Sequence, residues 1–236
     1  MKRVLALLGG RELGVLLAFA GIVAGIWLFA EIAGEVTEGD TQAFDRKLLL
    51  AMRHKGDLSP IGPPEMQDAA RDMTALGGVT ALTLITVVTG GFLFLDGKKH
   101  MALFLYGAVV GGTLLSLILK SLFQRPRPDL VPYGAYVSTT SFPSGHSMLS
   151  AVTYLTLGAL LARSHSRKRL KTYFLLLAAL LTFMVGISRV YLGVHWPTDV
   201  LAGWTAGATW AIVCWLLARR LQISHTIEAD KEQTPE

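Results

Sequence analysis

Three short groups of residues in the second half of the chain combine side chains that bind phosphate with side chains that transfer protons. They are Lys120 with Arg127-Pro128, then Pro143-Ser144-Gly145-His146, then Ser188-Arg189 with His195 and Asp199. Each group borders a strongly apolar segment. Ionisable residues beside such segments are costly to keep, so their concentration here predicts a functional site.

The cations and the small residues of these groups are suited to hold a phosphate. Lys120, Arg127 and Arg189 can neutralise its charge, and arginine adds a planar fork of donors that matches phosphate oxygens. Ser144 and Gly145 precede an apolar segment, so their backbone N–H groups are expected at a helix N-terminus, where anions bind. Without a Cβ, Gly145 also lets the backbone approach the anion closely. We therefore predict that these five residues bind phosphate.

The two histidines predict nucleophilic catalysis. Asp199 follows His195 by four residues, and Pro197 suits the first turn of the helix that begins between them. A hydrogen bond to Asp199 would fix the tautomer of His195 and stabilise its imidazolium, which leaves the other ring nitrogen as the nucleophile. His146, from a different segment, can protonate the departing alkoxide as a general acid.

We expect no metal ion and no other cofactor in this site. The sequence offers no spare carboxylate pair and no Cys/His cluster near these groups. Three fixed cations can supply the electrostatic stabilisation that metal ions provide in other phosphatases.

The histidines outside the three groups are expected to lie at the surface or the membrane interface. They are His54, His100, His165 and His225. Arg125 falls outside the spacing of the three groups, and we expect it to contact lipid headgroups.

Composition indicates an integral membrane protein. Of the 236 residues, 52% are hydrophobic and only 17% charged, whereas soluble domains carry about a quarter charged residues. About six apolar runs approach the roughly 20 residues that a spanning helix needs. They are Leu13–Ala33, Gly77–Leu95, Met101–Leu119, Met148–Ala162, Thr172–Ile187 and Val200–Leu217. We predict an all-α bundle of about six transmembrane helices over residues 1–223, with residues 224–236 as a polar, disordered tail.

Positive residues predict the orientation of this bundle. Alternate connections are rich in lysine and arginine, with Lys98, Lys99, Arg167, Lys168, Arg169 and Lys171 among them. By the positive-inside rule both termini are cytoplasmic, and all three groups then share the outer face. The apolar run after Lys2 and Arg3 is too long for a signal core, so we expect a retained helix.

The first outer connection, residues 34–76, is too polar to span. Phe44, Leu48, Ala51 and Met52 fall on one side of a short helix, with Asp45, Arg46 and Lys47 around the rest, which predicts a helix lying in the membrane interface. Pro60, Gly62, Pro63 and Pro64 end this helix, and helix is expected to resume from Glu65 to Asp72.

With these residues in place, the sequence resembles the type 2 phosphatidic acid phosphatases, also called lipid phosphate phosphatases. That family carries K-x6-R-P, then P-S-G-H, then S-R-x5-H-x3-D, and every position is matched here between Lys120 and Asp199. The resemblance implies a phosphohistidine on His195, oriented by Asp199, with His146 as proton donor. It also implies metal-independent hydrolysis on the outer face, periplasmic in a Gram-negative bacterium.

The compact length and the Thr74-Ala75-Leu76-Gly77-Gly78 stretch look like the bacterial branch of the family. The substrates that this branch implies are phosphatidylglycerol phosphate, undecaprenyl pyrophosphate, phosphatidic acid and diacylglycerol pyrophosphate. The first two are the preferred candidates for this chain. The expected partners are this lipid substrate and the membrane lipids. The net charge of +5 is assigned to the cytoplasmic loops, not to nucleic-acid binding, and no obligatory protein partner is evident.

Three other functions share features of this sequence. A lipid phosphotransferase would use the same site with an alcohol in place of water, and the sequence leaves this open. Vanadium-dependent haloperoxidases share the pocket but are larger soluble proteins. A transporter or channel predicts charges spread through the spans or paired broken helices, whereas the charges here gather near one face.

Overall fold

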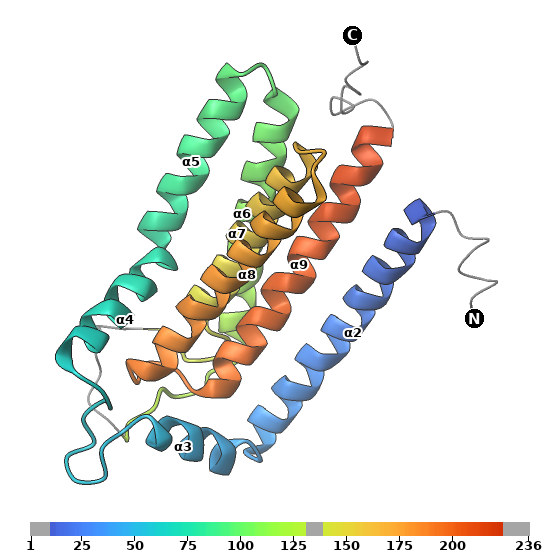
Figure 1. Cartoon of the computed structure of the whole chain (residues 1–236). Helices are drawn as coiled ribbons and strands as arrows, with labels where there is room; N and C mark the ends of the chain where they lie inside the picture. Colours follow the sequence, from blue (N-terminus) through green and yellow to red (C-terminus); the bar gives the residue numbers. More distant parts are fainter. Residues whose placement is uncertain (1–9, 131–138, 224–236) are drawn as a thin grey trace.

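The computed structural model describes residues 10–130 and 139–223, which form eight α-helices and no strand (Figure 1). They are α2 (Gly10–Glu38), α3 (Gln42–Ala51), α4 (Pro64–Leu76), α5 (Val79–Leu95), α6 (Lys99–Leu122), α7 (Gly145–Arg163), α8 (Lys168–Tyr191) and α9 (Pro197–Ile223). The six predicted apolar runs coincide with α2 and with α5 to α9. The predicted tail from residue 224 lies outside the described residues.

The predicted number of membrane spans is confirmed. Five helices, α2 and α6 to α9, are long and apolar enough to cross a bilayer, and α4 with α5 meets the same criteria as a pair of helices bent by 49°. The bend falls at Gly77 and Gly78, between the two helices. A Cβ on Gly77 would lie 2.2 Å from Cγ1 of Val185, so the glycine lets α8 approach the backbone closely.

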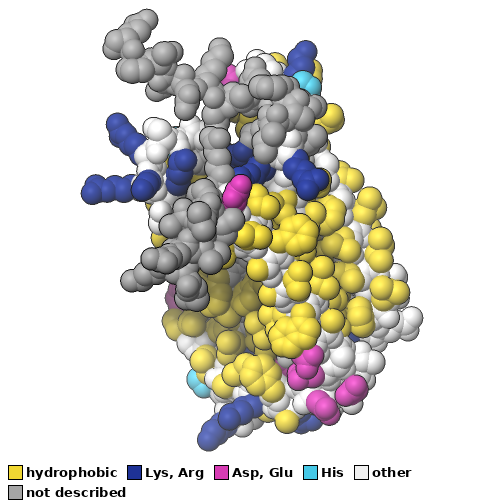
Figure 2. Space-filling view, turned by 90° about the vertical axis from the view of Figure 1, so that its right-hand side faces the viewer, with side chains coloured by type: hydrophobic (Ala, Val, Ile, Leu, Met, Phe, Trp, Pro, Cys, Tyr) yellow, Lys and Arg dark blue, Asp and Glu magenta, His cyan; other side chains and the backbone are white. Residues whose placement is uncertain are grey.

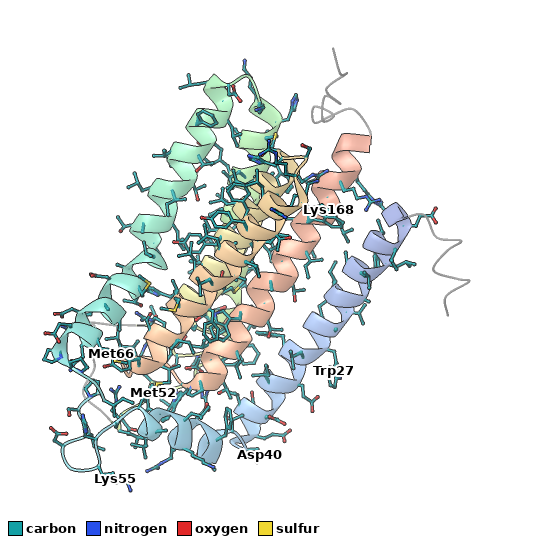
Figure 3. The ribbon with its side chains drawn as sticks, viewed as in Figure 1. Trp27, Asp40, Met52, Lys55, Met66 and Lys168 are labelled. Atoms are coloured by element: carbon teal, nitrogen blue, oxygen red, sulfur yellow. The ribbon has the colours of Figure 1, made fainter. Side chains whose placement is uncertain are left out.

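Lipid-facing hydrophobic side chains cover the outside of the bundle. Figure 2 shows them across the middle of one face, with charged side chains gathered at its two ends. Leu17, Phe19 and Trp27 of α2 are each more than 60% exposed, and Trp27 projects outward from that helix (Figure 3). In water such a surface would be unfavourable, whereas in a bilayer it is solvated by acyl chains. The chain is an integral membrane protein.

The core of the bundle is formed by α7, which packs against α8 on one side and α9 on another. Small residues allow this close approach, as is usual between membrane helices. A Cβ on Gly203 of α9 would lie 2.7 Å from the carbonyl oxygen of Ser144, and one on Gly207 would lie 2.5 Å from that of Met148. Glycines of α9 therefore set its distance from the beginning of α7.

Replacing Gly203 by alanine is expected to lower the free energy of unfolding by about 1–3 kcal/mol, because the added methyl overpacks a backbone contact. Thermal unfolding in detergent, followed by tryptophan fluorescence, measures the change. Gly107→Ala is the matched control, since a Cβ there meets nothing within 4 Å. Alanine at that helical position should leave stability unchanged or raise it by up to about 1 kcal/mol. Equal melting temperatures for the two variants would contradict the packing argument.

The elements that carry the three groups meet at one end of the bundle, here called the site end. Figure 1 shows α3, the beginning of α4, the connection after α6 and the turn between α8 and α9 at this end. The beginning of α2 and the end of α9 lie at the opposite end, as does Lys168 in Figure 3, while Met52 and Lys55 lie at the site end. The prediction that all three groups share one end is confirmed.

The short helix predicted in residues 34–76 is present as α3, and helix resumes at α4. Its environment differs from the prediction. Phe44 and Leu48 are 48% and 38% exposed, whereas Asp45 and Leu49 on the neighbouring face are fully buried. The helix is therefore docked on the bundle through a face that contains a carboxylate.

Candidate active site

His195 and Asp199 meet where α8 gives way to α9. The chain turns between the two helices at Gly193, whose φ of +74° favours glycine. Nδ1 of His195 lies 3.4 Å from Oδ2 of Asp199, and the two side chains are 2% and 0% exposed. The same carboxylate oxygen accepts the backbone N–H of Trp196 at 2.9 Å. The predicted pairing is present, with His195 just before the first residue of α9.

Ser141 completes this pair and was missed in the sequence. Its hydroxyl donates a short hydrogen bond to Oδ2 of Asp199 and lies 3.4 Å from Nδ1 of His195. The residue is fully buried and immediately precedes the Phe142-Pro143 bond. Its only sequence signal is its position two residues before the P-S-G-H motif.

The other ring nitrogen of His195 faces Arg127. Nη1 of Arg127 lies 3.2 Å from Nε2 of His195 and donates to the carbonyl of Val194 at 2.6 Å. With its proton on Nδ1 beside Asp199, the ring directs its Nε2 lone pair toward this guanidinium. Burial lowers the pKa of His195 to about 4; Asp199 opposes this effect, and the charges of Arg189 and Arg127 add to it. The imidazole is therefore neutral near pH 7.

Lys120 and Arg127 are brought together by the segment that follows residue 138. Nζ of Lys120 donates to the carbonyl of Thr140 at 2.8 Å, and Nε of Arg127 donates to that of Thr139 at 2.8 Å. A Cβ on Gly145 would lie 3.3 Å from Cε of Lys120. The first two motif groups are therefore in contact, and the absence of a side chain at Gly145 leaves room for the lysine.

Ser144 lies at the N-terminus of α7, as the sequence predicted, and its side chain caps that helix. Its Oγ accepts the backbone N–H of Ser147 at 3.4 Å and the hydroxyl of Ser147 at 2.9 Å. Its own N–H donates to the backbone carbonyl of Asp199 at 3.0 Å. The beginning of α7 is thereby fixed against the beginning of α9, and the positive end of the α7 dipole points into the cluster of cations and histidines.

Arg189 and His146 both lie beside the bend between α4 and α5. Nη1 of Arg189 donates to Oγ1 of Thr74 at 2.9 Å, and a Cβ on Gly78 would lie 3.9 Å from Nε2 of His146. Arg189 is 2% exposed, and in the described part of the chain its Nε has no hydrogen-bond partner. A buried donor of this kind is suited to bind an anion. Thr74 is a second residue of the site that the sequence did not predict.

The prediction for Arg125 is wrong. Its side chain is only 10% exposed, and it does not extend toward headgroups. Nη1 donates to Oδ1 of Asp199 at 2.7 Å, and Nη2 donates to Oδ2 of Asp45 at 2.6 Å. The physical reason is that both carboxylates are fully buried, and a buried carboxylate without a cation is strongly unfavourable.

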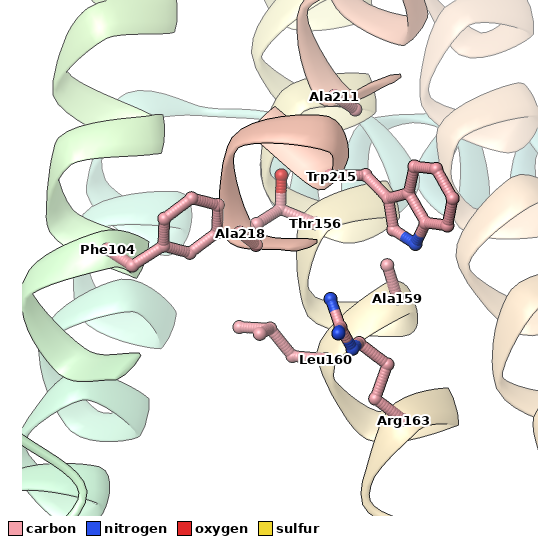
Figure 4. Close-up of a pocket in the computed structure, with 8 residues that line it drawn as sticks. All are labelled: Phe104, Thr156, Ala159, Leu160, Arg163, Ala211, Trp215 and Ala218. Carbon is pink, nitrogen blue, oxygen red and sulfur yellow. The ribbon is translucent and has the colours of Figure 1, made fainter. Parts of the chain in front are cut away.

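A shallow pocket at the opposite end of the bundle is separate from this chemistry. It lies between α6, α7 and α9 and is lined by Phe104, Thr156, Ala159, Leu160, Arg163, Ala211, Trp215 and Ala218 (Figure 4). It contains no residue of the three motif groups. At the site end, by contrast, residues of all three groups lie within hydrogen-bond or van der Waals distance of one another.

The chain is similar in sequence to a family of known membrane phosphatases. The model of the PAP2 superfamily matches residues 101–223. Phosphatidylglycerophosphatase B of Bacillus subtilis is 35% identical over 150 residues, which cover 62% of this chain and 72% of that protein. An undecaprenyl-diphosphatase of Sulfolobus acidocaldarius is 35% identical over 144 residues, covering 59% of this chain and 63% of that protein.

A solved structure supports the same relationship. The crystal structure of a transmembrane PAP2-type phosphatidylglycerolphosphate phosphatase from Bacillus subtilis superimposes with a TM-score of 0.75 at 28% identity. The superposition covers 85% of this chain and 96% of that one. The chain therefore belongs to the PAP2 superfamily, in its bacterial branch of type 2 phosphatidic acid phosphatases, and is a membrane lipid phosphatase that hydrolyses phosphoric esters.

Proposed function

We propose that this enzyme hydrolyses a lipid phosphate through a phosphohistidine on His195. Nε2 of His195 attacks phosphorus and forms the N–P bond while the bond from phosphorus to the lipid oxygen breaks. Protonated His146 gives its proton to the departing lipid oxygen. Asp199 holds the Nδ1–H of His195 and stabilises the positive charge that develops on the ring.

The second step returns the enzyme to its starting state. His146, now neutral, takes a proton from water, and the oxygen of that water attacks phosphorus. The N–P bond breaks, its electron pair returns to Nε2, and inorganic phosphate leaves. Lys120, Arg127 and Arg189, with the N–H groups at Ser144 and Gly145, hold the three equatorial oxygens throughout.

The observation that carries this proposal is the environment of Nε2 of His195. The buried, neutral ring donates toward Asp199 on one side and faces the Arg127 guanidinium on the other. A phosphate that replaces this arginine contact would be bound by the cation and adjacent to the nucleophile. Around it, four cations (Lys120, Arg125, Arg127, Arg189) stand against two carboxylates (Asp45, Asp199). Protonated His146 adds a fifth positive charge, and this excess of positive charge favours binding of a phosphate monoester dianion.

The donor set also favours a mechanism without a metal ion. The described residues contain no cluster of three or more His, Cys, Asp or Glu side chains that could hold one. Asp199, the carboxylate beside His195, has its oxygens directed at Arg125, Ser141 and Trp196. The cations beside Nε2 would repel a divalent ion and attract the substrate phosphate.

We propose phosphatidylglycerol phosphate as the first substrate to test, and undecaprenyl pyrophosphate as the second. The relatives named above act on lipids of these two kinds according to their names. Both lipids present a phosphate at the membrane surface on a hydrophobic anchor. A site at the end of a bundle of apolar helices is suited to such a molecule.

We propose that the site end faces the outside of the bacterial inner or plasma membrane and that both termini are cytoplasmic. The support is the distribution of lysine and arginine. The opposite end carries Lys98, Lys99, Arg163, Arg167, Lys168, Arg169 and Lys171 in short connections, which the positive-inside rule retains in the cytoplasm. A reporter enzyme attached to the C-terminus and found active outside the cytoplasm would contradict this orientation.

The test is phosphate release by the purified enzyme from a panel of lipid phosphates in mixed micelles, with EDTA present. We expect release from phosphatidylglycerol phosphate at a rate that EDTA leaves unchanged, because the charge stabilisation comes from fixed side chains. Loss of release on adding EDTA would contradict the metal-independent mechanism. A phosphorylated acceptor lipid in place of free phosphate would identify a phosphotransferase instead.

A further inference from the structure

Asp199 has two carboxylate oxygens with separate sets of partners. Oδ2 accepts from Ser141 and from the N–H of Trp196, and it faces His195. Oδ1 accepts from Arg125 at 2.7 Å. A charge-assisted bond of this length is the strongest type of hydrogen bond available to a carboxylate. Arg125 therefore fixes the rotation of Asp199 about its side chain and, through it, the direction of His195.

The guanidinium of Arg125 also forms hydrogen bonds with α3 and with the residue before it. Its Nη2 donates to Oδ2 of Asp45 at 2.6 Å and lies 3.1 Å from Oγ1 of Thr41. Asp45 is fully buried, although it belongs to a helix that lies at the membrane surface. Arg125 thus bridges two buried carboxylates, one beside the nucleophile and one on the surface helix.

Asp45 also contacts the first turn of α9, which carries Asp199. Its Oδ1 accepts the backbone N–H of Thr198 at 3.0 Å, and its Oδ2 accepts the hydroxyl of Thr198 at 2.7 Å. A carboxylate at this place satisfies an N–H group that the helix leaves unpaired and interacts favourably with the helix dipole. The beginning of α9 is therefore held from two directions by Asp45 and Arg125.

We propose that Arg125 is a positioning residue for the phosphatase reaction and that, with Asp45, it holds Asp199 in the orientation that His195 requires. Neither residue touches the reacting atoms in this arrangement. Both act through Asp199, and the inference rests on the proposed roles of His195 and Asp199. It also assigns a purpose to α3, which contacts the beginning of α9 both through Arg125 and through the bonds between Asp45 and Thr198.

Replacing Arg125 by glutamine is expected to lower kcat about 10²-fold with little change in KM, because a small displacement of a catalytic group has an effect of this size. Lys120 and Arg127, which face the phosphate, should instead affect KM as well. Arg125→Lys keeps the charge but cannot donate to both carboxylates in one plane, so it should recover only part of kcat. Thermal unfolding in detergent shows whether each variant is folded.

The pH profile separates positioning from a structural role. The titratable and charged groups that act on His195 are Asp199 of α9, Arg127 after α6, Arg189 of α8 and His146 of α7. Without the positive charge of Arg125, Asp199 attracts the imidazole proton more strongly, so His195 binds that proton at higher pH. The acid limb of kcat/KM should move to higher pH in Arg125→Gln and return toward the wild-type position in Arg125→Lys.

A double-mutant cycle tests the link to α3. Asp45→Asn should lower kcat about 10-fold, and the Asp45→Asn, Arg125→Gln pair should lose less than the product of the two single effects, because both act through one network. Arg46→Gln, an exposed change on α3, is the matched control and should behave as wild type.

The outcomes are distinguishable. An unchanged kcat in folded Arg125→Gln would overturn the inference, and so would a lower kcat with an unmoved acid limb and no recovery by lysine. Phosphate release that persists in His195→Gln would overturn the proposed function itself, whatever Arg125 does.

Discussion

Replacing His195 by glutamine should lower kcat for phosphate release by at least about 10⁴-fold. An enzyme that loses its nucleophile keeps only the rate that binding and electrostatic stabilisation provide. Glutamine is close to histidine in size and can still donate to Asp199, so the fold should persist. The measurement is single-turnover phosphate release from the best lipid of the panel, with thermal unfolding in detergent as the check on folding.

His100→Gln is the matched control for this change, because His100 is exposed at the beginning of α6, at the end opposite the site. It should retain wild-type activity. Acid-quenching methods destroy phosphohistidine, so the intermediate should be trapped with radiolabelled substrate and an alkaline quench. Label on the wild type and none on His195→Gln supports the mechanism, whereas equal labelling of both would assign the nucleophile to another residue.

Asp199→Asn should lower kcat by about 10³- to 10⁴-fold while KM changes little. An asparagine can donate from its amide to Nδ1 of His195, which would favour the tautomer with the proton on Nε2, where the lone pair is needed. The change also removes the ion pair with Arg125 at 2.7 Å, which leaves that guanidinium paired with the Asp45 carboxylate and with the hydroxyls of Thr41 and Thr198. Both effects act on the chemical step and leave the phosphate-binding cations in place.

The control for this prediction is Asp96→Asn. Asp96 forms an exposed ion pair with Lys98 at the opposite end of the bundle, and such pairs contribute little to stability or function. Initial rates over a range of lipid concentrations separate kcat from KM. A variant at Asp199 that is folded and loses less than 10-fold in kcat would show that His195 does not depend on this carboxylate.

The helices and the contact between His195 and Asp199 could be predicted from the sequence because both follow from local patterns. Long apolar runs specify spans whatever surrounds them, and the short separation of His195 and Asp199 brings the two side chains together at the beginning of α9. The helix N-terminus at Ser144 has the same local origin, since serine is a preferred capping residue. In each case the information lies within a few residues of the site that it defines.

The partners of these residues could not be predicted because their contacts cross the whole chain. Asp45 meets Arg125 across 80 residues, and Thr74 meets Arg189 across 115. No local pattern marks either pair. The amphipathic pattern of α3 was also misleading, since it grouped Asp45 with the polar residues Arg46 and Lys47, which are exposed, whereas Asp45 is fully buried against the bundle. Arg125 was misinterpreted because the two carboxylates with which it forms ion pairs lie far away in sequence.

The contact between Asp45 and Thr198 has a consequence for how the protein is made. The two residues are separated by 153 positions, so at a synthesis rate of roughly 5–20 residues per second Asp45 emerges roughly 8–30 seconds before its partner exists. Arg125 follows Asp45 by only 80 residues, so it is synthesised roughly 4–16 seconds after it and can contact the carboxylate before Thr198 exists. The contacts of Asp45 with the first turn of α9 can form only after that helix has been synthesised. The active site is the final part of the molecule to be assembled, and a ribosome that stops before α9 releases a chain without phosphatase activity.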